Sequence, residues 1–212
     1  MSNDAPTAKH HILDCGERLI ATKGFVGVGL AEILAVAGVP KGSFYHYFSS
    51  KERFGEALLV RYMDRYVQGL EAMFRPDGTT GRVRLMRYWQ HWNSTQCATS
   101  CDPTADTHSP ATTTTSTKCL VVKLSAEVAD MSEAMRLTLR DGTDQIVQRI
   151  AGCLQDAVAD GSVPPHLDAH ATALTLYQLW LGASLLSKLR RDNSPFEHAL
   201  LATEQILDST LV

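Results

Sequence analysis

The residues best suited to chemistry near the start of the chain lie in one segment, VPKGSFYHYFSSKERF, at positions 39–54. It combines aromatic rings, cationic side chains, a histidine and small residues. If positions 40–48 form a helix, with roughly 100° between successive residues, one face carries Phe44, Tyr47 and Phe48. Large rings that share a helix face usually pack into a core, so we predict that this face anchors the helix.

The opposite face of the same helix is small, polar and cationic. It carries Gly42 and His46, flanked by Ser43 and Tyr45, with Lys41 in the first turn. A helix N-terminus attracts phosphate, and a glycine inside a helix costs stability, which suggests close approach to a partner. This pattern favours binding to an anion such as DNA. The competing interpretation is a small helical hairpin that only packs.

A second short helix is expected just before this one. Leu30, Ile33, Leu34 and Ala37 recur with helical spacing, and Gly38 closes the pattern. Two short helices joined by a tight glycine turn are typical of a helix-turn-helix motif. The second helix of such a motif enters the major groove with its N-terminal residues toward the bases.

The rest of the chain also has helical periodicity, with no strand alternation and no internal repeat. Ser49 with Glu52 gives a capping-box pattern at the start of a helix toward Phe74. Ser194 as cap and Pro195 in the first turn open a final helix. Further helices are expected at 82–96, from about 120, at 132–160 and at 168–191. We therefore predict an all-α fold.

Composition is that of an ordinary globular protein of 212 residues, 44% hydrophobic, with a net charge of −3. Residues 1–66 carry eight Lys or Arg against seven Asp or Glu, so this part alone suits an anionic partner.

The N-terminus has no apolar secretory segment and no run is long enough to span a membrane, so we expect a cytoplasmic protein. The five scattered cysteines then indicate free thiols. Residues 99–117, eleven of them Ser or Thr, indicate a poorly packed loop.

The segment GFVGVGLAEILAVAGVPKGSFYHYFSSKERF, residues 24–54, resembles the DNA-binding domain of TetR-type transcriptional repressors. The matching features are the GF pair, the AGVPKG turn, the FYHYF core and the SKE opening of the next helix. The resemblance implies a three-helix helix-turn-helix domain at 1–50 and a helical ligand-sensing and dimerisation domain at 51–212. The expected DNA contacts are Lys41, Gly42, Ser43, Tyr45, His46 and Lys51, the last to a phosphate. Many relatives have Ser or Thr where this chain has Gly29, so that side-chain contact should be absent.

Two later segments, CLVVKLSAEVADMSEAMR and LWLGASLLSKLRR, resemble the subgroup that represses the N-ethylmaleimide reductase gene and senses reactive electrophiles. This resemblance implies that Cys119 is the reacting thiol. It implies a repressor released from its operator by an electrophile or oxidant.

The surroundings of Cys119 in the sequence fit that role. It lies between Lys118 and Lys123 at the expected start of a helix, and both cations and helix N-termini lower the pKa of a thiol. Lys188 could approach Cys119 and activate it, or capture the oxidised sulfur. The alternative is that Cys119 is a small buried residue and Lys188 a solvated helix end.

Other interpretations of the sequence predict different chemistry. A zinc site is conceivable from Cys97, Cys101, His108 and Cys119. The Thr-rich segment gives those residues no rigid spacing, so we expect neither metal nor cofactor. A non-covalent inducer could instead occupy an apolar pocket lined by Trp89, Trp92, Tyr177 and Trp180. The alternative for these rings is that they only pack in the hydrophobic core. A thiol-dependent enzyme needs a base held against its cysteine, and no Cys–His–acid arrangement follows from this spacing, so we expect no enzyme.

We therefore predict a homodimeric repressor that binds a roughly palindromic operator. The last two helices, at about 168–190 and 194–210, would form a four-helix dimer interface. The expected anchors of that interface are Leu174, Leu181, Leu185, Phe196, Leu200 and Leu207.

Overall fold

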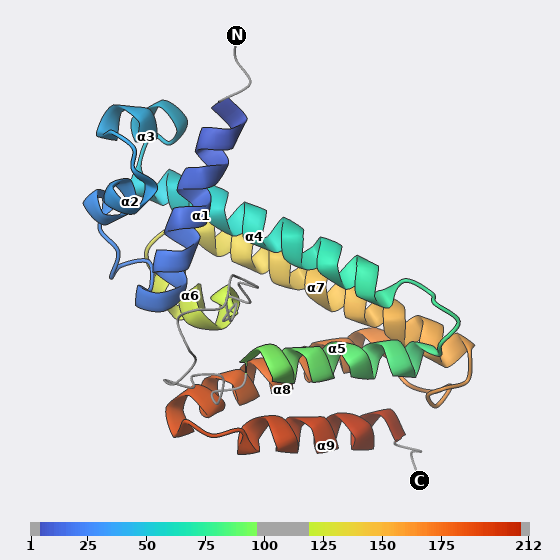
Figure 1. The fold of residues 1–212 in the computed structure, drawn as a ribbon. Coiled ribbons are helices and arrows are strands. Elements are labelled where there is room, and N and C mark those ends of the chain that lie inside the picture. The colour runs from blue at the N-terminus through green and yellow to red at the C-terminus, as the bar shows by residue number, and fades with distance from the viewer. Residues whose placement is uncertain (1–4, 97–118, 209–212) are drawn as a thin grey trace, which may run out of the picture. The chain divides into compact units, whose positions relative to one another are not determined.

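The computed structural model describes residues 5–96 and 119–208, and every regular element within those ranges is a helix (Figure 1). The prediction of an all-α fold is confirmed. The helices are α1 (Ala5–Lys23), α2 (Leu30–Ala37), α3 (Lys41–Tyr47), α4 (Lys51–Phe74), α5 (Gly81–Gln96), α6 (Leu120–Ala129), α7 (Glu133–Ala159), α8 (Ala169–Arg190) and α9 (Ser194–Asp208). None of these described helices is long and apolar enough to cross a membrane.

The described helices pack into two compact units. The first contains the residues up to Tyr66 together with Cys119–Thr143, and the second contains those from Val67 and from Asp144 onward. Thus α1, α2, α3 and α6 belong to the first unit, α5, α8 and α9 to the second, and α4 and α7 contribute a part to each. These units follow packing, whereas the functional division expected between residues 50 and 51 stays a prediction.

The first unit is built around an aromatic cluster. The ring of Phe44 on α3 is fully buried, with its centroid 5.2 Å from that of Phe48 and 5.5 Å from that of Phe54. A Cβ atom on Gly16 of α1 would come 2.2 Å from Phe54, so α1 lies very close to this ring. The predicted ring face therefore anchors α3, although Tyr47 is only half-buried.

Two glycines in the left-handed region end the first two helices. Gly24 follows α1 with φ +81°, and Gly38 follows α2 with φ +63°. The N–H of Gly38 donates to the carbonyls of Ala35 and Leu34, which is the usual way a left-handed residue terminates a helix. Pro40 then caps α3, so the turn between the two helices has the tight form that the sequence predicts.

The cap of α4 differs from the predicted one. The hydroxyl of Ser50, not Ser49, accepts the N–H of Arg53 at 3.1 Å, because α4 begins one residue later than the capping-box pattern assumes. The pKa of the Glu52 carboxyl is lowered by its own backbone N–H and by the Ser50 hydroxyl. The cap thus satisfies donors of the first turn that would otherwise be orphaned.

The second unit has an indole core. Trp89 of α5 stacks on Trp180 of α8, with centroids 5.0 Å apart and planes 14° apart, and Phe196 of α9 lies 6.0 Å from Trp180. The indole N–H of Trp180 donates to the Thr203 hydroxyl at 3.0 Å. The stacked rings bury a large apolar area, which fixes α5, α8 and α9 together.

The ends of α8 and α9 are set by polar caps. Asp168 accepts two backbone N–H groups of the first turn of α8, near the boundary predicted from the sequence. Helix α9 begins one residue earlier than predicted: Ser194 is its first residue, and its hydroxyl donates to Asp192 rather than capping the helix. The carbonyl of Asn193 accepts the first helical bonds instead.

The contact between α5 and α7 gives a test of this packing. A Cβ on Gly81 would lie 2.4 Å from the nitrogen and 2.6 Å from the Cα of Ala157. We predict that Gly81→Ala lowers the free energy of unfolding by about 1–3 kcal/mol, because neither backbone yields cheaply. Denaturant unfolding measures this, with Gly152→Ala as the control, since a Cβ there meets open space. A Gly81→Ala protein as stable as the wild type would contradict the described contact.

Candidate nucleic-acid interface and sensor thiol

The exposed side of α3 carries the side chains that the sequence assigns to DNA contact. Tyr45 is 46% exposed. Lys41, Gly42 and His46 are exposed beside it, and Ser43 is half-buried. The first turn of α3 contains no acidic residue, so nothing there opposes an approaching phosphate.

Ring contacts hold this surface in place. The Lys41 ammonium lies 5.7 Å from the centroid of the Tyr45 ring, a cation–π distance. The Tyr45 ring meets the buried Phe44 ring edge-on at 5.6 Å, and His46 meets Tyr47 edge-on at 4.9 Å. The phenol is therefore supported by the buried Phe44 ring and the imidazole by the half-buried Tyr47 ring, while both side chains stay exposed.

Gly42 has no structural reason to be glycine within the described part of the chain. A Cβ built on it meets nothing within 4 Å, and its φ lies outside the positive region. A glycine inside a helix costs about 0.5–1 kcal/mol relative to alanine. Gly29 is the N-cap residue of α2 and makes no side-chain cap hydrogen bond.

Lys51, the predicted phosphate contact, has a partner inside the protein. Its ammonium donates to the carbonyl of Phe25 at 2.7 Å and lies 4.5 Å from the centroid of the Phe25 ring. Lys51 thus ties the start of α4 to the connection between α1 and α2. Its contact with DNA stays a prediction.

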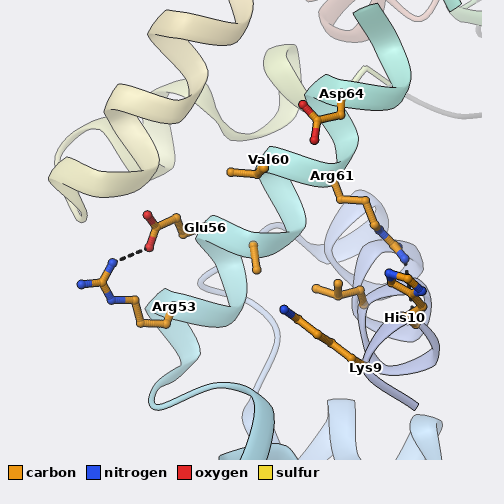
Figure 2. Close-up of a pocket in the computed structure, with 9 residues that line it drawn as sticks. Lys9, His10, Arg53, Glu56, Val60, Arg61 and Asp64 are labelled. Atoms are coloured by element: carbon orange, nitrogen blue, oxygen red, sulfur yellow. Dashed lines mark hydrogen bonds and ion pairs between the residues drawn. The ribbon is translucent and has the colours of Figure 1, made fainter. Parts of the chain in front are cut away.

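A shallow groove of about 400 Å³ lies between α1 and α4 in the first unit (Figure 2). Its lining mixes charges of both signs. Arg53 pairs with Glu56 at 2.7 Å, and Arg61 pairs with Asp14 at 2.7 Å. Carboxylates thus neutralise both arginines of the groove, and no predicted site residue lines it.

Cys119 is the N-cap residue of α6 and is only 5% exposed. This burial agrees with the alternative interpretation of Cys119 as a small buried residue, because the apolar face of α6, which includes Leu120 and Leu124, is buried and the cap residue adjoins it. The Tyr62 hydroxyl donates to the sulfur at 3.9 Å and accepts the Leu120 N–H at 3.3 Å. Burial, and then the neighbouring Cys119, raise the pKa of Tyr62 well above its usual value, so the phenol keeps its proton.

Tyr62 is a neighbour of the thiol that sequence reasoning missed. It lies on a buried face of α4, where the sequence marks it only as one of several apolar positions. Nothing in the local pattern pairs it with a residue 57 positions away. Only the packing of α4 against α6 brings the phenol to the sulfur.

The lysines expected near Cys119 lie in different surroundings. Lys123 donates to the carbonyl of Thr22 at 3.2 Å, so its ammonium is bound to α1. Lys118 lies outside the described residues. Lys188 is exposed in the last turn of α8 and belongs to the second unit, so its approach to Cys119 stays a prediction.

The other cysteines fall into two groups. Cys15 and Cys153 are buried free thiols. Burial raises the pKa of Cys153 to about 11, despite the opposing charge of Arg84. Cys97 and Cys101, together with His108 and the Thr-rich segment 99–117, lie outside the described residues. Among the residues that the structure does describe, no cluster of His, Cys, Asp or Glu could hold a metal ion.

The rings proposed as a pocket pack against one another. Trp89, Trp92, Tyr177 and Trp180 are all buried. The Trp92 ring lies 5.9 Å from Tyr177 and 6.3 Å from Trp180, and its N–H donates to the Ser184 hydroxyl at 3.0 Å. This is the geometry of an aromatic core, and a ligand at this place would have to separate the rings.

The predicted dimer anchors divide by exposure. Phe196 and Leu207 are fully buried within the subunit and are therefore core residues, contrary to the prediction. Leu181 and Leu200 are half-buried. The exposed leucines on α8 and α9 are Leu174, Leu185, Leu186, Leu189 and Leu201.

Comparison with known proteins agrees with this architecture. Residues 12–58 match the family described as bacterial regulatory proteins, tetR family, and residues 106–203 match the tetracyclin repressor-like, C-terminal domain. The HTH-type transcriptional repressor NemR of Escherichia coli (strain K12) is 36% identical over 204 residues, 96% of each chain. The transcriptional regulator AcuR of Cereibacter sphaeroides is 30% identical over 192 residues, 91% of this chain and 81% of its own.

A solved structure supports the same assignment. The crystal structure of reduced E. coli NemR matches with a TM-score of 0.83 at 36% identity, covering 97% of this chain and all of its own. These relatives are transcriptional regulators and not enzymes. From its helix-turn-helix unit, its all-helical remainder and these similarities, the chain belongs to the TetR family of transcriptional repressors.

Proposed function

We propose that this repressor binds a roughly palindromic operator as a homodimer and is released when a reactive electrophile or an oxidant modifies Cys119. The burial of the Cys119 sulfur is the observation that carries this proposal. A buried thiol has no room for an adduct, so modification must change the packing around it. Similarity to NemR, named as a repressor and solved in a reduced form, adds support.

On the DNA side, support comes from the exposed face of α3. TetR-family repressors dimerise and bind operator DNA. In this chain the residues proposed to contact the bases or backbone are Lys41, Gly42, Ser43, Tyr45 and His46. Lys51, at the start of α4, donates one hydrogen bond to Phe25. Its ammonium has further N–H donors, which would contact a phosphate.

On the sensor side, an adduct at Cys119 conflicts with its neighbours. The sulfur lies against the Tyr62 hydroxyl and within the first turn of α6. A maleimide ring added there must displace the phenol or lift α6. Overpacking a core costs about 1–3 kcal/mol, and moving a conformational equilibrium from one state to another takes a few kcal/mol. The two magnitudes are comparable, so one adduct per subunit is enough.

The oxidant response would use the same sulfur. Hypochlorous acid converts a thiol to a sulfenic acid and releases chloride and a proton. The deprotonated amine of Lys188 would then attack the sulfenic sulfur, forming a sulfur–nitrogen bond and releasing water. The exposure of Lys188 supports this role, because an exposed side chain moves without breaking a core.

A second candidate is a non-covalent inducer in the second unit. Two buried polar atoms on α5, Trp89 Nε1 and Asn93 Oδ1, have no hydrogen-bond partner among the described residues. Buried polar atoms without partners are costly, and a polar ligand would satisfy both. The close packing of the rings favours the covalent mechanism.

The exposed leucines of α8 and α9 support the proposed dimer interface. These two helices pack directly on each other, so their outer faces form one surface. Leu189 is 71% exposed and Leu201 56% exposed. Burial of such side chains against a partner contributes about 1.5–3 kcal/mol each.

We predict that Leu189→Glu shifts the protein toward monomers, because it places a charge in the apolar surface of α8. Sedimentation velocity over a range of concentrations measures the shift, and operator binding should weaken with it. Val83→Glu, a matched change at an exposed valine of α5, should leave the dimer intact. A Leu189→Glu protein that dimerises like the wild type would place the interface elsewhere.

We predict that Gly42→Ala stabilises the fold by about 0.5–1 kcal/mol and weakens operator binding about tenfold. No described residue lies within 4 Å of the added methyl group, so we expect the loss to arise where DNA approaches. Gly69 is an exposed glycine of α4 with equally open surroundings. Gly69→Ala should therefore raise the free energy of unfolding by a similar amount without weakening operator binding. Fluorescence anisotropy with operator duplex and thermal unfolding test both. Unchanged operator affinity in Gly42→Ala would contradict the proposed orientation of α3.

We predict that Cys119→Ser represses normally and no longer responds to N-ethylmaleimide or hypochlorous acid. The hydroxyl fills nearly the same space and still accepts a hydrogen bond from Tyr62, but it does not react. Operator affinity before and after each reagent measures the response, with mass spectrometry to locate the adducts. Cys153→Ser is the control, since a thiol with a pKa of about 11 stays protonated at neutral pH. Release of DNA from treated Cys119→Ser would move the sensor to another cysteine.

A further inference from the structure

We propose that Glu127 is a positioning residue that fastens α6 to the DNA-binding helices and thereby transmits the state of Cys119 to them. The proposal rests on the proposed function of Cys119 as the sensor. It concerns contacts within the first unit only.

The carboxylate of Glu127 caps the connection between α1 and α2. Its two oxygens accept the backbone N–H groups of Phe25, at 3.0 Å, and Val26, at 2.5 Å. Bonds from N–H groups to a carboxylate are stronger than neutral hydrogen bonds, and two parallel ones fix direction as well as distance. Glu127 therefore holds a segment about a hundred positions away in the sequence.

The backbone of the connection is shaped to receive this carboxylate. Gly24 has φ +81°, which L side chains rarely adopt, and a Cβ there would lie 2.8 Å from a Glu127 oxygen. The glycine thus allows both the turn and the close approach. Successive N–H groups that converge on one anion form an anion-binding concavity, and here the anion belongs to α6.

Two lysines complete the attachment. Lys123, one turn earlier on α6, donates to the carbonyl of Thr22 at 3.2 Å. Lys51 of α4 donates to the carbonyl of Phe25 at 2.7 Å. The end of α1 and the connection that follows it are therefore held by α6 through two side chains and by α4 through a third.

Helix α6 joins this attachment to the sensor. Cys119 caps one end, and Glu127 lies eight residues later, roughly 12 Å along the axis. Because an intact helix of this length moves as one piece, an adduct that lifts its first turn also moves Glu127. The bonds to Phe25 and Val26 then pull on the connection that leads into α2 and α3.

The test compares the effect of Cys119 modification in three proteins. The DNA duplex is first selected from random sequences by the reduced wild-type protein. The affinity of wild type, Glu127→Gln and Glu133→Gln for this duplex is then measured, both for the reduced protein and after reaction with N-ethylmaleimide. Glu133→Gln is a matched control, because Glu133 pairs with Arg136 of its own helix. Fluorescence anisotropy gives the operator affinity, and mass spectrometry confirms equal modification of Cys119.

We expect modification to weaken wild type and Glu133→Gln at least a hundredfold, and Glu127→Gln at most tenfold. The side-chain amide of glutamine has one acceptor oxygen, and its N–H₂ group would face the second backbone N–H. One of the two hydrogen bonds to Phe25 and Val26 is therefore lost. A residue with a merely structural role would change the affinity of the reduced protein without changing this ratio. Glu127→Asp, which keeps the charge but is one methylene shorter, gives the same readout if Glu127→Gln folds poorly.

The outcomes separate the two proposals. Equal weakening of wild type, Glu127→Gln and Glu127→Asp would overturn the role of Glu127 and leave Cys119 as the sensor. A wild-type protein that keeps its affinity after modification of Cys119 would overturn the proposed sensor, and the role of Glu127 with it.

Discussion

The backbone of Phe25 is held at both its N–H and its carbonyl, and the connection between α1 and α2 is fixed by that clamp. Glu127 accepts its N–H, and Lys51 donates to its carbonyl while lying over the phenyl ring. One residue of the α1–α2 connection thus joins α6, α4 and the helix-turn-helix. The clamp is made of charge-assisted bonds on the backbone, so its geometry does not depend on which apolar side chains surround it.

In the proposed mechanism, burial of the thiol connects this clamp to regulation. A reactive cysteine on an open surface could carry an adduct without consequence for the fold. Cys119 instead caps α6 beneath the Tyr62 hydroxyl, so a small adduct becomes a packing conflict. The same burial limits access, so the proposed reaction would require the first turn of α6 to open. Under this proposal, the rate of reaction with the reagent and the size of the response would both depend on the local stability of that turn.

The sequence predicts the DNA-binding helices better than their connections to the sensor. Ring spacing and the glycine turn identify α3 because they are local patterns with one physical meaning. The cap of α4 shifts from Ser49 to Ser50, since two adjacent serines offer the same pattern. Pairing of Glu127 with Phe25, more than a hundred residues apart, has no local signature, because only tertiary packing brings α6 to the connection.

The outer helices show a similar limit, since a helical stripe of leucines does not reveal which ones face the subunit's own core. The measurement that tests the account most directly is amide hydrogen exchange at Phe25 and Val26, by NMR, before and after N-ethylmaleimide modifies Cys119. The account predicts that both amides are protected in the reduced protein and exchange at least tenfold faster after modification. Unchanged exchange at both amides, in a modified protein that has lost its operator affinity, would contradict it.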